Sequence, residues 1–171
     1  MKEITNQEFG GERPLFGQRN IALRNVTVHP GESALKFCAG VEACNCRFEG
    51  KYPFWHVDGF CIRNCEFTPG ARAALWYSRN LIMEDTQVDA PKMFREMDGI
   101  IMRRVRIPDG EETLWHCSNV ELEDVEINRA DYLFMHSRHI RINNYRQQGN
   151  YSFRCGDPQR SHRFQRCVLG H

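Results

Sequence analysis

Aromatic side chains recur at intervals of about twenty residues through the middle of the chain. All three tryptophans belong to this series, at Trp55, Trp76 and Trp115. Arg95 occupies the equivalent place in the repeat between Trp76 and Trp115. The residues that follow them are His56, Tyr77, Glu96 and His116. Flat rings beside hydrogen-bonding groups suit a sugar chain, because the rings supply apolar contact and the polar atoms fix orientation. We therefore predict a ligand-binding face for an oligosaccharide at these residues.

The same series has a purely structural interpretation. A repetitive fold stacks like residues on one another, so columns of rings arise without any ligand. Arg95 would then lie between Trp76 and Trp115 as a cation stacked on two rings. A carbohydrate-binding surface and a purely structural or scaffolding solenoid therefore both remain open at this point.

Carboxylates offer a second kind of chemistry. Asp58 and Asp98 occupy equivalent places two repeats apart, which would separate them by about 9.6 Å if the repeats stack as strands. This distance is near the upper edge of what an inverting glycosidase uses. However, Arg79 stands between them, and each aspartate precedes a glycine in a pattern typical of a turn. We assign no catalytic residue, and an enzyme of the polysaccharide lyase or glycoside hydrolase type, using this pair or Glu96, stays an alternative.

The cysteines could in principle bind a metal ion. Cys46 and Cys65 fall at positions that should face the core, whereas Cys44 and Cys61 do not. Four thiolates arranged in this way cannot converge tetrahedrally on zinc. We expect no metal site and no cofactor.

A repeat of apolar residues must position the candidate face. In one copy the apolar residues are Phe60, Ile62, Cys65 and Phe67, so the steps are two, three and two. Strand side chains alternate between faces, so the odd step indicates two short strands joined by a bend. Asn64 stands at this bend and suits a left-handed backbone. Equivalent copies begin at Ile21, Val41, Phe60, Leu81, Ile100, Val120 and Ile140.

A third short strand in each copy, which carries the ring series on its outer side, completes the unit. Three strands per coil of roughly 20 residues, without a helical period, predict an all-β fold. We expect a single-stranded, right-handed parallel β-helix of about seven coils. An all-β sandwich is the alternative.

The chain should form a single domain over residues 1–171. We expect an N-terminal cap at 1–14, regular coils at 15–153, and an irregular tail with an incomplete last rung at 154–171. The tail recovers the repeat spacing at Phe164, Cys167 and Leu169. An uncovered last rung would offer unpaired backbone, so homo-association through this end is a prediction.

Composition narrows the classes of partner. The chain has 23 Lys and Arg against 22 Asp and Glu, so no excess charge attracts nucleic acid or a membrane surface. The N-terminus lacks a secretory signal, and no segment is apolar enough to span a bilayer. We expect a soluble cytoplasmic protein.

Several short motifs resemble a known family. They are Gly11–Gly17 (GERPLFG), Lys51–Trp55 (KYPFW), Ala71–Tyr77 (ARAALWY), Ala90–Arg95 (APKMFR), Glu112–Trp115 (ETLW) and Gly149–Phe153 (GNYSF). The chain is similar to an uncharacterised bacterial family, a domain of unknown function with a pectin-lyase-like right-handed β-helix. The resemblance covers roughly residues 10–153 and implies the fold; it brings no established activity and no catalytic residue. Members usually continue for several more coils, and this chain departs from the pattern after Phe153.

Overall fold

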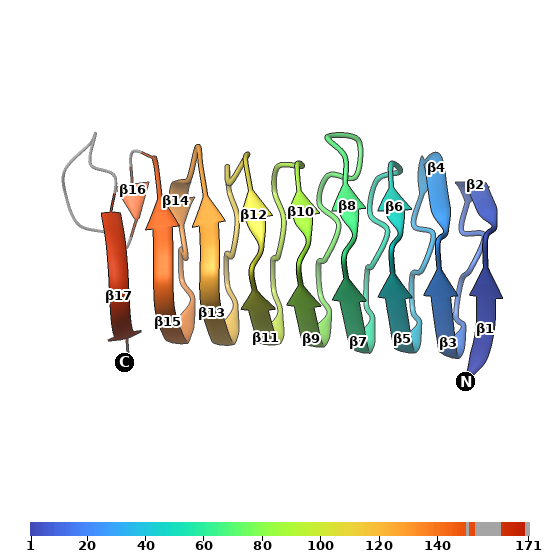
Figure 1. The fold of residues 1–171 in the computed structure, drawn as a ribbon, viewed down its shortest axis with the longest axis horizontal. Helices are drawn as coiled ribbons and strands as arrows, with labels where there is room; N and C mark the ends of the chain where they lie inside the picture. Colours follow the sequence, from blue (N-terminus) through green and yellow to red (C-terminus); the bar gives the residue numbers. More distant parts are fainter. Residues whose placement is uncertain (150, 153–161, 170–171) are drawn as a thin grey trace.

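The chain winds as a solenoid of stacked coils in a computed structural model (Figure 1). The structure describes residues 1–149, 151–152 and 162–169. The first strand of each early coil is β1 (Lys2–Thr5), β3 (Arg19–Arg24), β5 (Ala39–Cys44), β7 (Asp58–Arg63), β9 (Arg79–Glu84) or β11 (Asp98–Arg103). The second strand is β2 (Glu8–Glu12), β4 (Thr27–Glu32), β6 (Arg47–Phe48), β8 (Glu66–Phe67), β10 (Gln87–Val88) or β12 (Arg106–Ile107). Later elements are β13 (Ser118–Ile127), β14 (Asp131–Leu133), β15 (Arg138–Gln147), β16 (Tyr151–Ser152) and β17 (His162–Leu169).

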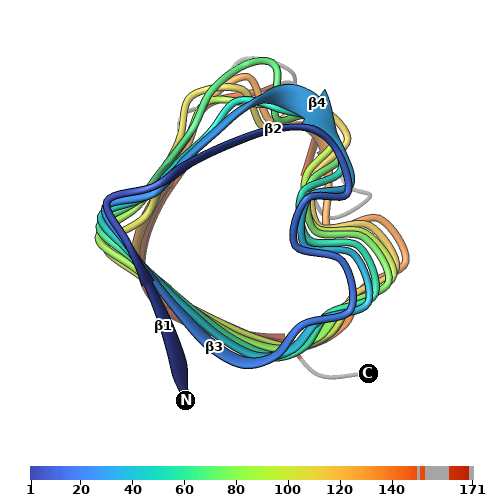
Figure 2. The same cartoon turned by 90° about the vertical axis from the view of Figure 1, so that its right-hand side faces the viewer.

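Successive coils pair in the register that the sequence repeat predicts. Phe60 lies opposite Val41 on one side and Leu81 on the other, and all these pairings are parallel. Seen from the N-terminal end, the coils turn clockwise as they recede, so the solenoid is right-handed (Figure 2). The prediction of an all-β parallel solenoid of about seven coils is confirmed.

The inward columns form one continuous core. Cys46 and Cys65 are buried in the same column, flanked by Val26 and Thr86, which are buried too. Phe48 and Phe67 stack in the next column with ring centroids 4.9 Å apart. Each coil buries little by itself, so these columns hold neighbouring coils together.

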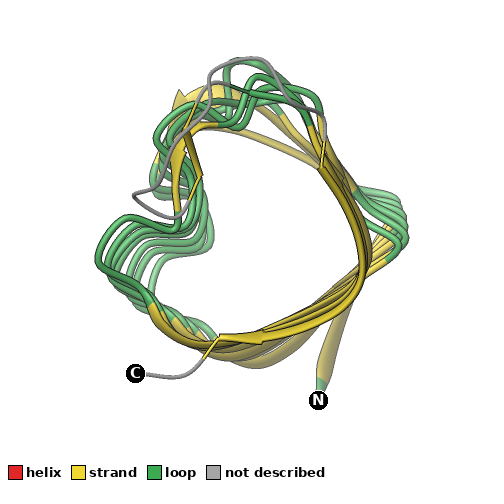
Figure 3. Cartoon of the chain, turned by 90° about the vertical axis from the view of Figure 1, so that its left-hand side faces the viewer, coloured by secondary structure: helices red, strands yellow, loops and turns green. Residues whose placement is uncertain are grey.

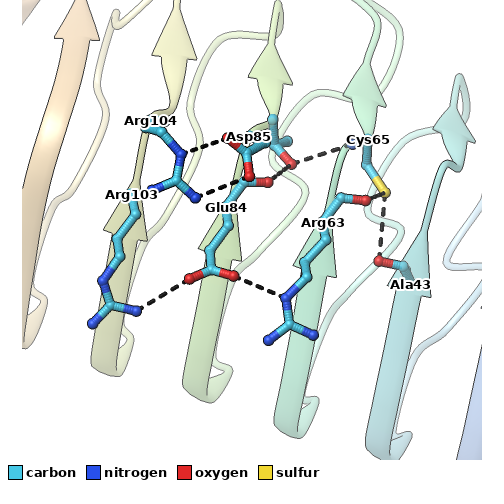
Figure 4. Close-up of polar contacts among 8 residues, drawn as sticks. Ala43, Arg63, Cys65, Glu84, Asp85, Arg103 and Arg104 are labelled. Carbon is cyan, nitrogen blue, oxygen red and sulfur yellow. Dashed lines mark hydrogen bonds and ion pairs between the residues drawn. The ribbon is translucent and has the colours of Figure 1, made fainter.

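A ladder of asparagines lines the bend between the first and second strands. Asn25, Asn45 and Asn64 have φ of 53°, 55° and 50°, the left-handed conformation expected there. Each side chain donates to the preceding one, from Asn45 to Asn25 at 3.2 Å and from Asn64 to Asn45 at 2.6 Å. In the following coils Asp85 takes this place and accepts two hydrogen bonds from Arg104 (Figure 4).

Charged side chains on the outer face of the first strands are paired between coils. Glu84 of β9 accepts hydrogen bonds from Arg63 of β7 at 2.8 Å and from Arg103 of β11 at 3.2 Å (Figure 4). Exposed pairs of this kind stabilise a fold only weakly one by one. They do, however, neutralise this column.

The third segment of most coils is not the strand that we expected. It consists of turns, shown as loops on one side of the solenoid in Figure 3. Left-handed residues interrupt it: in one coil Phe94 and Glu96 have φ of 56° and 53°. Only isolated parallel bridges, such as Trp76 with Arg95, remain, and β14 pairs with β16 in the last coils. Phe94 is buried and Glu96, two residues later, is exposed, so the two faces do not alternate here as they would in a strand.

The two ends also differ from expectation. Residues 1–14, expected as a cap, form a coil of the same kind, because β1 pairs with β3 and β2 with β4. At the other end β17 pairs with β15 in the antiparallel direction, placing Leu169 opposite Ile140. We expected a further parallel rung here, but the spacing of apolar residues does not specify strand direction. Residues 154–161 of the expected tail lie outside the described part. Association through this end would have to use the outer edge of β17, and it stays a prediction.

Candidate functional site

The predicted ring series forms a half-buried column on the third segments. Trp55 and Trp76 stack face to face, with centroids 5.6 Å apart and ring planes 8° apart. The guanidinium carbon of Arg95 lies 4.4 Å from the centroid of Trp76 and 4.7 Å from that of Trp115. The arrangement is the stacked cation that the packing interpretation describes.

Hydrogen bonds fix the orientation of the indoles. The Nε1–H groups of Trp55, Trp76 and Trp115 donate to backbone carbonyls of the next coil, at 2.6, 2.7 and 2.7 Å. The ring faces therefore point along the solenoid axis, where neighbouring side chains cover them. On its free side Trp55 meets Tyr52, at 4.5 Å between centroids, and the ammonium of Lys36 at 5.5 Å. The faces of Trp55 and Trp76 therefore leave no room for a sugar to stack.

Arg95 has an unusual polar environment. Its Nη2 donates to Glu112 at 3.0 Å, and the same carboxylate oxygen lies 3.3 Å from the ammonium of Lys92. The Nε of Arg95 is buried and has no hydrogen-bond partner. Two cations, Arg95 and Lys92, thus share one oxygen of the Glu112 carboxylate, and Arg95 directly precedes Glu96 in the chain.

The residues that follow the indole column form a second, exposed column. Phe37, His56 and Tyr77 stack in sequence, with centroid distances of 4.8 and 5.1 Å and interplanar angles of 15° and 13°. His116 stacks on His136 at 4.9 Å. All five residues have positive φ, and all five side chains are exposed. Partial burial, with the charge of Lys36 as a smaller cause, lowers the pKa of His56.

Glu96 interrupts this exposed column. One face of Tyr77 stacks on His56, and no ring or cation in the described part of the chain covers the other face. His116 has its free face on the opposite side, because its partner His136 belongs to the following coil. Tyr77 and His116 lie two rung spacings apart, with the Glu96 coil between them, so their free faces look toward each other across about 9.6 Å. We call this space, bounded by Tyr77, Glu96 and His116, the Glu96 slot.

No partner within residues 1–149 forms a hydrogen bond or an ion pair with the Glu96 carboxylate. Tyr77 is 45% exposed, and Glu96 and His116 are exposed as well. The slot therefore combines two accessible ring faces with one carboxylate that can accept hydrogen bonds.

A groove that we did not predict from the sequence lies on the outer face of β9, β11, β13 and β15. Its volume is about 610 Å³. Ile82 and Ile101 form its apolar part, and Asn80, Gly99 and Asn119 run beside them. Glu121, His139 and Arg141 complete the polar rim. We call it the Gly99 groove. The available signal was two isoleucines at an outward position that is occupied by Glu42, Glu121 and Arg141 in other coils.

The carboxylates of Asp58 and Asp98 each accept two hydrogen bonds from neighbouring side chains. Asp58 accepts hydrogen bonds from Arg79 at 2.8 Å and Asn80 at 2.9 Å. Asp98 accepts from a serine hydroxyl and from Asn119, each at 2.7 Å. These bonds, from Arg79 above all at Asp58 and from the serine at Asp98, lower the pKa of both carboxyls. A carboxyl held ionised in this way is a poor general acid.

The two aspartates instead orient amide groups at the groove. Because the Nδ2 of Asn80 is bonded to Asp58, its Oδ1 turns toward the groove and lies 3.3 Å from where a Cβ on Gly99 would be. Asp98 holds the Nδ2 of Asn119 in the same way. The groove is thereby supplied with hydrogen-bond acceptors at fixed positions.

Other site types receive no support from the described residues. Within them no group of three or more His, Cys, Asp or Glu could hold a metal ion. Cys46 and Cys65 are buried while Cys44 and Cys61 are half-buried, as expected, and all four are free thiols. The same part of the chain has no helix of the length and apolarity that crossing a membrane requires.

Comparison with known proteins gives one match. Neither the curated proteins nor the solved structures include a match to this chain. One family model, described as a protein of unknown function (DUF3737), matches residues 2–159. The matched region begins at β1 and includes every residue of the Glu96 slot and the Gly99 groove. The chain therefore belongs to the DUF3737 family of proteins of unknown function.

Proposed function

We propose that this protein binds an oligosaccharide and that the Glu96 slot holds one of its sugar rings. The observation that supports this most is the pair of uncovered ring faces, on Tyr77 and His116, that look toward each other across the Glu96 coil. Elsewhere in the column Phe37, His56 and one face of Tyr77 stack on one another, and His116 stacks on His136. The predicted indoles Trp55, Trp76 and Trp115, with Arg95, then act as a packed floor beneath the site.

The width of the slot favours a puckered ring over a flat one. Carbon atoms in contact lie about 3.5–4.0 Å apart, so a flat ring between two faces needs only about 7–8 Å in total. Two rung spacings give about 9.6 Å and leave roughly 2 Å for the thickness of the ligand itself. A saturated, puckered ring such as a pyranose matches this space.

Polar groups at the slot match hydroxyls. The Glu96 carboxylate accepts hydrogen bonds and has no competing protein partner. Hydrogen bonds from a hydroxyl to a charged acceptor contribute about 1.5–3 kcal/mol each. The imidazole of His116 and the phenol of Tyr77 add further donors and acceptors at the rim.

Binding can be tested with a panel of defined oligosaccharides, both neutral and uronic. The readout is intrinsic fluorescence followed by calorimetry. We expect a bound sugar to perturb the emission, because Trp76 and Trp115 lie under the slot. Glu96→Gln should weaken binding about tenfold, because it removes the charge from one hydrogen bond. Tyr77→Ala should weaken binding as well, because it removes one of the two ring faces.

Phe37→Ala provides the matched control. It removes an exposed ring from the same column, outside the slot, and should leave affinity unchanged. Equal losses in Phe37→Ala and Tyr77→Ala would show that the slot is not the site. No binding to any member of the panel would refute the proposal as a whole.

A further inference from the structure

We infer that the ligand runs around the coil rather than along the solenoid axis, with one sugar unit in the Glu96 slot and the next in the Gly99 groove. This inference rests on the proposed function and specifies the path and minimum length of the ligand. On this inference, full affinity requires a ligand of at least two linked sugar units.

The two places belong to the same three coils. The slot is formed at Tyr77, Glu96 and His116, and the groove begins three residues later in each coil, at Asn80, Gly99 and Asn119. Three residues span at most about 11 Å even when fully extended. A short oligosaccharide can therefore contact both sites without leaving the surface.

The axial path is closed at the depth of the slot. On the N-terminal side His56 stacks on Tyr77, with centroids 5.1 Å apart. On the C-terminal side His136 stacks on His116 at 4.9 Å. A chain that enters the slot must continue around the coil, and the Gly99 groove is the recess that it meets there.

The chemistry of the groove suits a second sugar unit. Ile82 and Ile101 offer an apolar surface to the C–H face of a ring. The Oδ1 of Asn80, held in place by Asp58, accepts from a hydroxyl. Gly99, with φ of 78° and no side chain, leaves the space between the two asparagines open.

The test measures affinity against ligand length by calorimetry. The probes are the best oligosaccharide from the panel, its monosaccharide and the intermediate lengths. The wild-type protein should bind the disaccharide at least about tenfold more tightly than the monosaccharide, the gain expected from a few additional hydrogen bonds. Ile101→Gln should abolish this gain and leave the affinity for the monosaccharide unchanged.

Cys61→Gln is the matched control, since Cys61 lies in the same outward column but outside the groove. The Cys61→Gln variant should still bind the disaccharide more tightly than the monosaccharide, as the wild type does. Ile82→Gln serves as a second groove variant, and an unchanged urea midpoint verifies that each variant is folded.

Two results would overturn the inference while leaving saccharide binding in place. One is an affinity that does not increase from monosaccharide to disaccharide. The other is a gain that survives both Ile101→Gln and Ile82→Gln although Glu96→Gln weakens binding as expected. If the wild-type protein binds no probe, the proposed function itself fails and the inference fails with it.

Discussion

Arg95 lies flat on Trp76, with its guanidinium carbon 4.4 Å from the indole centroid, and Trp115 covers its other side at 4.7 Å. The cation thus continues an indole stack across a coil that lacks a tryptophan. The same coil has Glu96 in place of a ring in the exposed column, so the ring stack of that column is interrupted at this coil. Arg95 is therefore packed within the indole stack, whereas the next residue, Glu96, is accessible to solvent.

Replacing Arg95 with Met should destabilise the protein. The substitution keeps length and apolar contact but removes the ion pair with Glu112 and two cation–π interactions, and the latter are together worth about 1–3 kcal/mol of the free energy of unfolding. Urea unfolding followed by tryptophan emission measures the loss. Arg104→Met is the control, because Arg104 forms only an exposed pair with Asp85, and it should cost no more than about 1 kcal/mol. Equal losses in the two variants would show that the stack contributes nothing special.

The fold could be predicted from the sequence because each coil repeats the same inward residues. The spacing of Phe60, Ile62, Cys65 and Phe67 specified both strands and the bend, and the register confirms it. The direction of β17 could not be predicted, since alternation is the same in parallel and antiparallel strands. The kinked third segment was missed for a different reason. Phe94 is buried and Glu96, two residues later, is exposed, so the left-handed backbone breaks the alternation that we assumed for a strand.

The site could be predicted only in part. Composition identified the ring columns, but which ring faces are free depends on rotamers and on the hydrogen bonds of the indoles. Trp76 is closed because its Nε1–H donates to the carbonyl of Lys92. One face of the Tyr77 ring is uncovered because the next coil has Glu96, and not a ring, at the equivalent position. The Gly99 groove depends on outward isoleucines, and an outward apolar residue in a single sequence resembles ordinary surface variation.

The asparagine ladder should be sensitive to backbone strain. Asn45 has φ of 55°, donates to Asn25 and accepts from Asn64. Asn45→Ala loses these bonds and places an alanine, which tolerates the left-handed region less well than asparagine, at this φ, so we expect a loss of about 1–3 kcal/mol. Asn45→Gly loses the same bonds without the strain, and it should be more stable than the alanine variant by about 1 kcal/mol. Urea midpoints that rank the two variants in the opposite order would contradict this explanation.

His29 should make stability depend on pH. Its ring nitrogens lie 2.8 Å from Glu8 and 3.2 Å from Glu49, and these hydrogen bonds raise its pKa above the ordinary value of 6.5. Arg47 and His29 lower the pKa of Glu49, so that carboxylate stays ionised. The folded state therefore favours protonated His29. Its contribution is complete below the unfolded pKa and disappears as pH rises through the higher folded pKa.

Wild type should therefore exceed His29→Gln in urea midpoint by more at about pH 5.5 than at about pH 8.5, on either side of the histidine range. Glu8→Gln removes the closer partner, and it should reduce this pH dependence while keeping the histidine. The same wild-type advantage at both pH values would show that protonation of His29 is not coupled to folding.

Close backbone packing at Gly31 of β4 leaves no space for a side chain. Gly31 lies opposite Gly11 of β2, and a Cβ on Gly31 would be 2.1 Å from the Gly11 carbonyl oxygen. Backbone atoms cannot rotate away as a side chain can, so Gly31→Ala should force the coils apart and cost about 1–3 kcal/mol of stability. At Gly10 the nearest atom would be His29 Cβ at 3.7 Å, an ordinary contact. Gly10→Ala should therefore stay within about 0.5 kcal/mol of wild type. Since both changes restrict the unfolded chain equally, a difference in urea midpoint reports the steric contact between β2 and β4, and equal midpoints would show that these coils can separate at little cost.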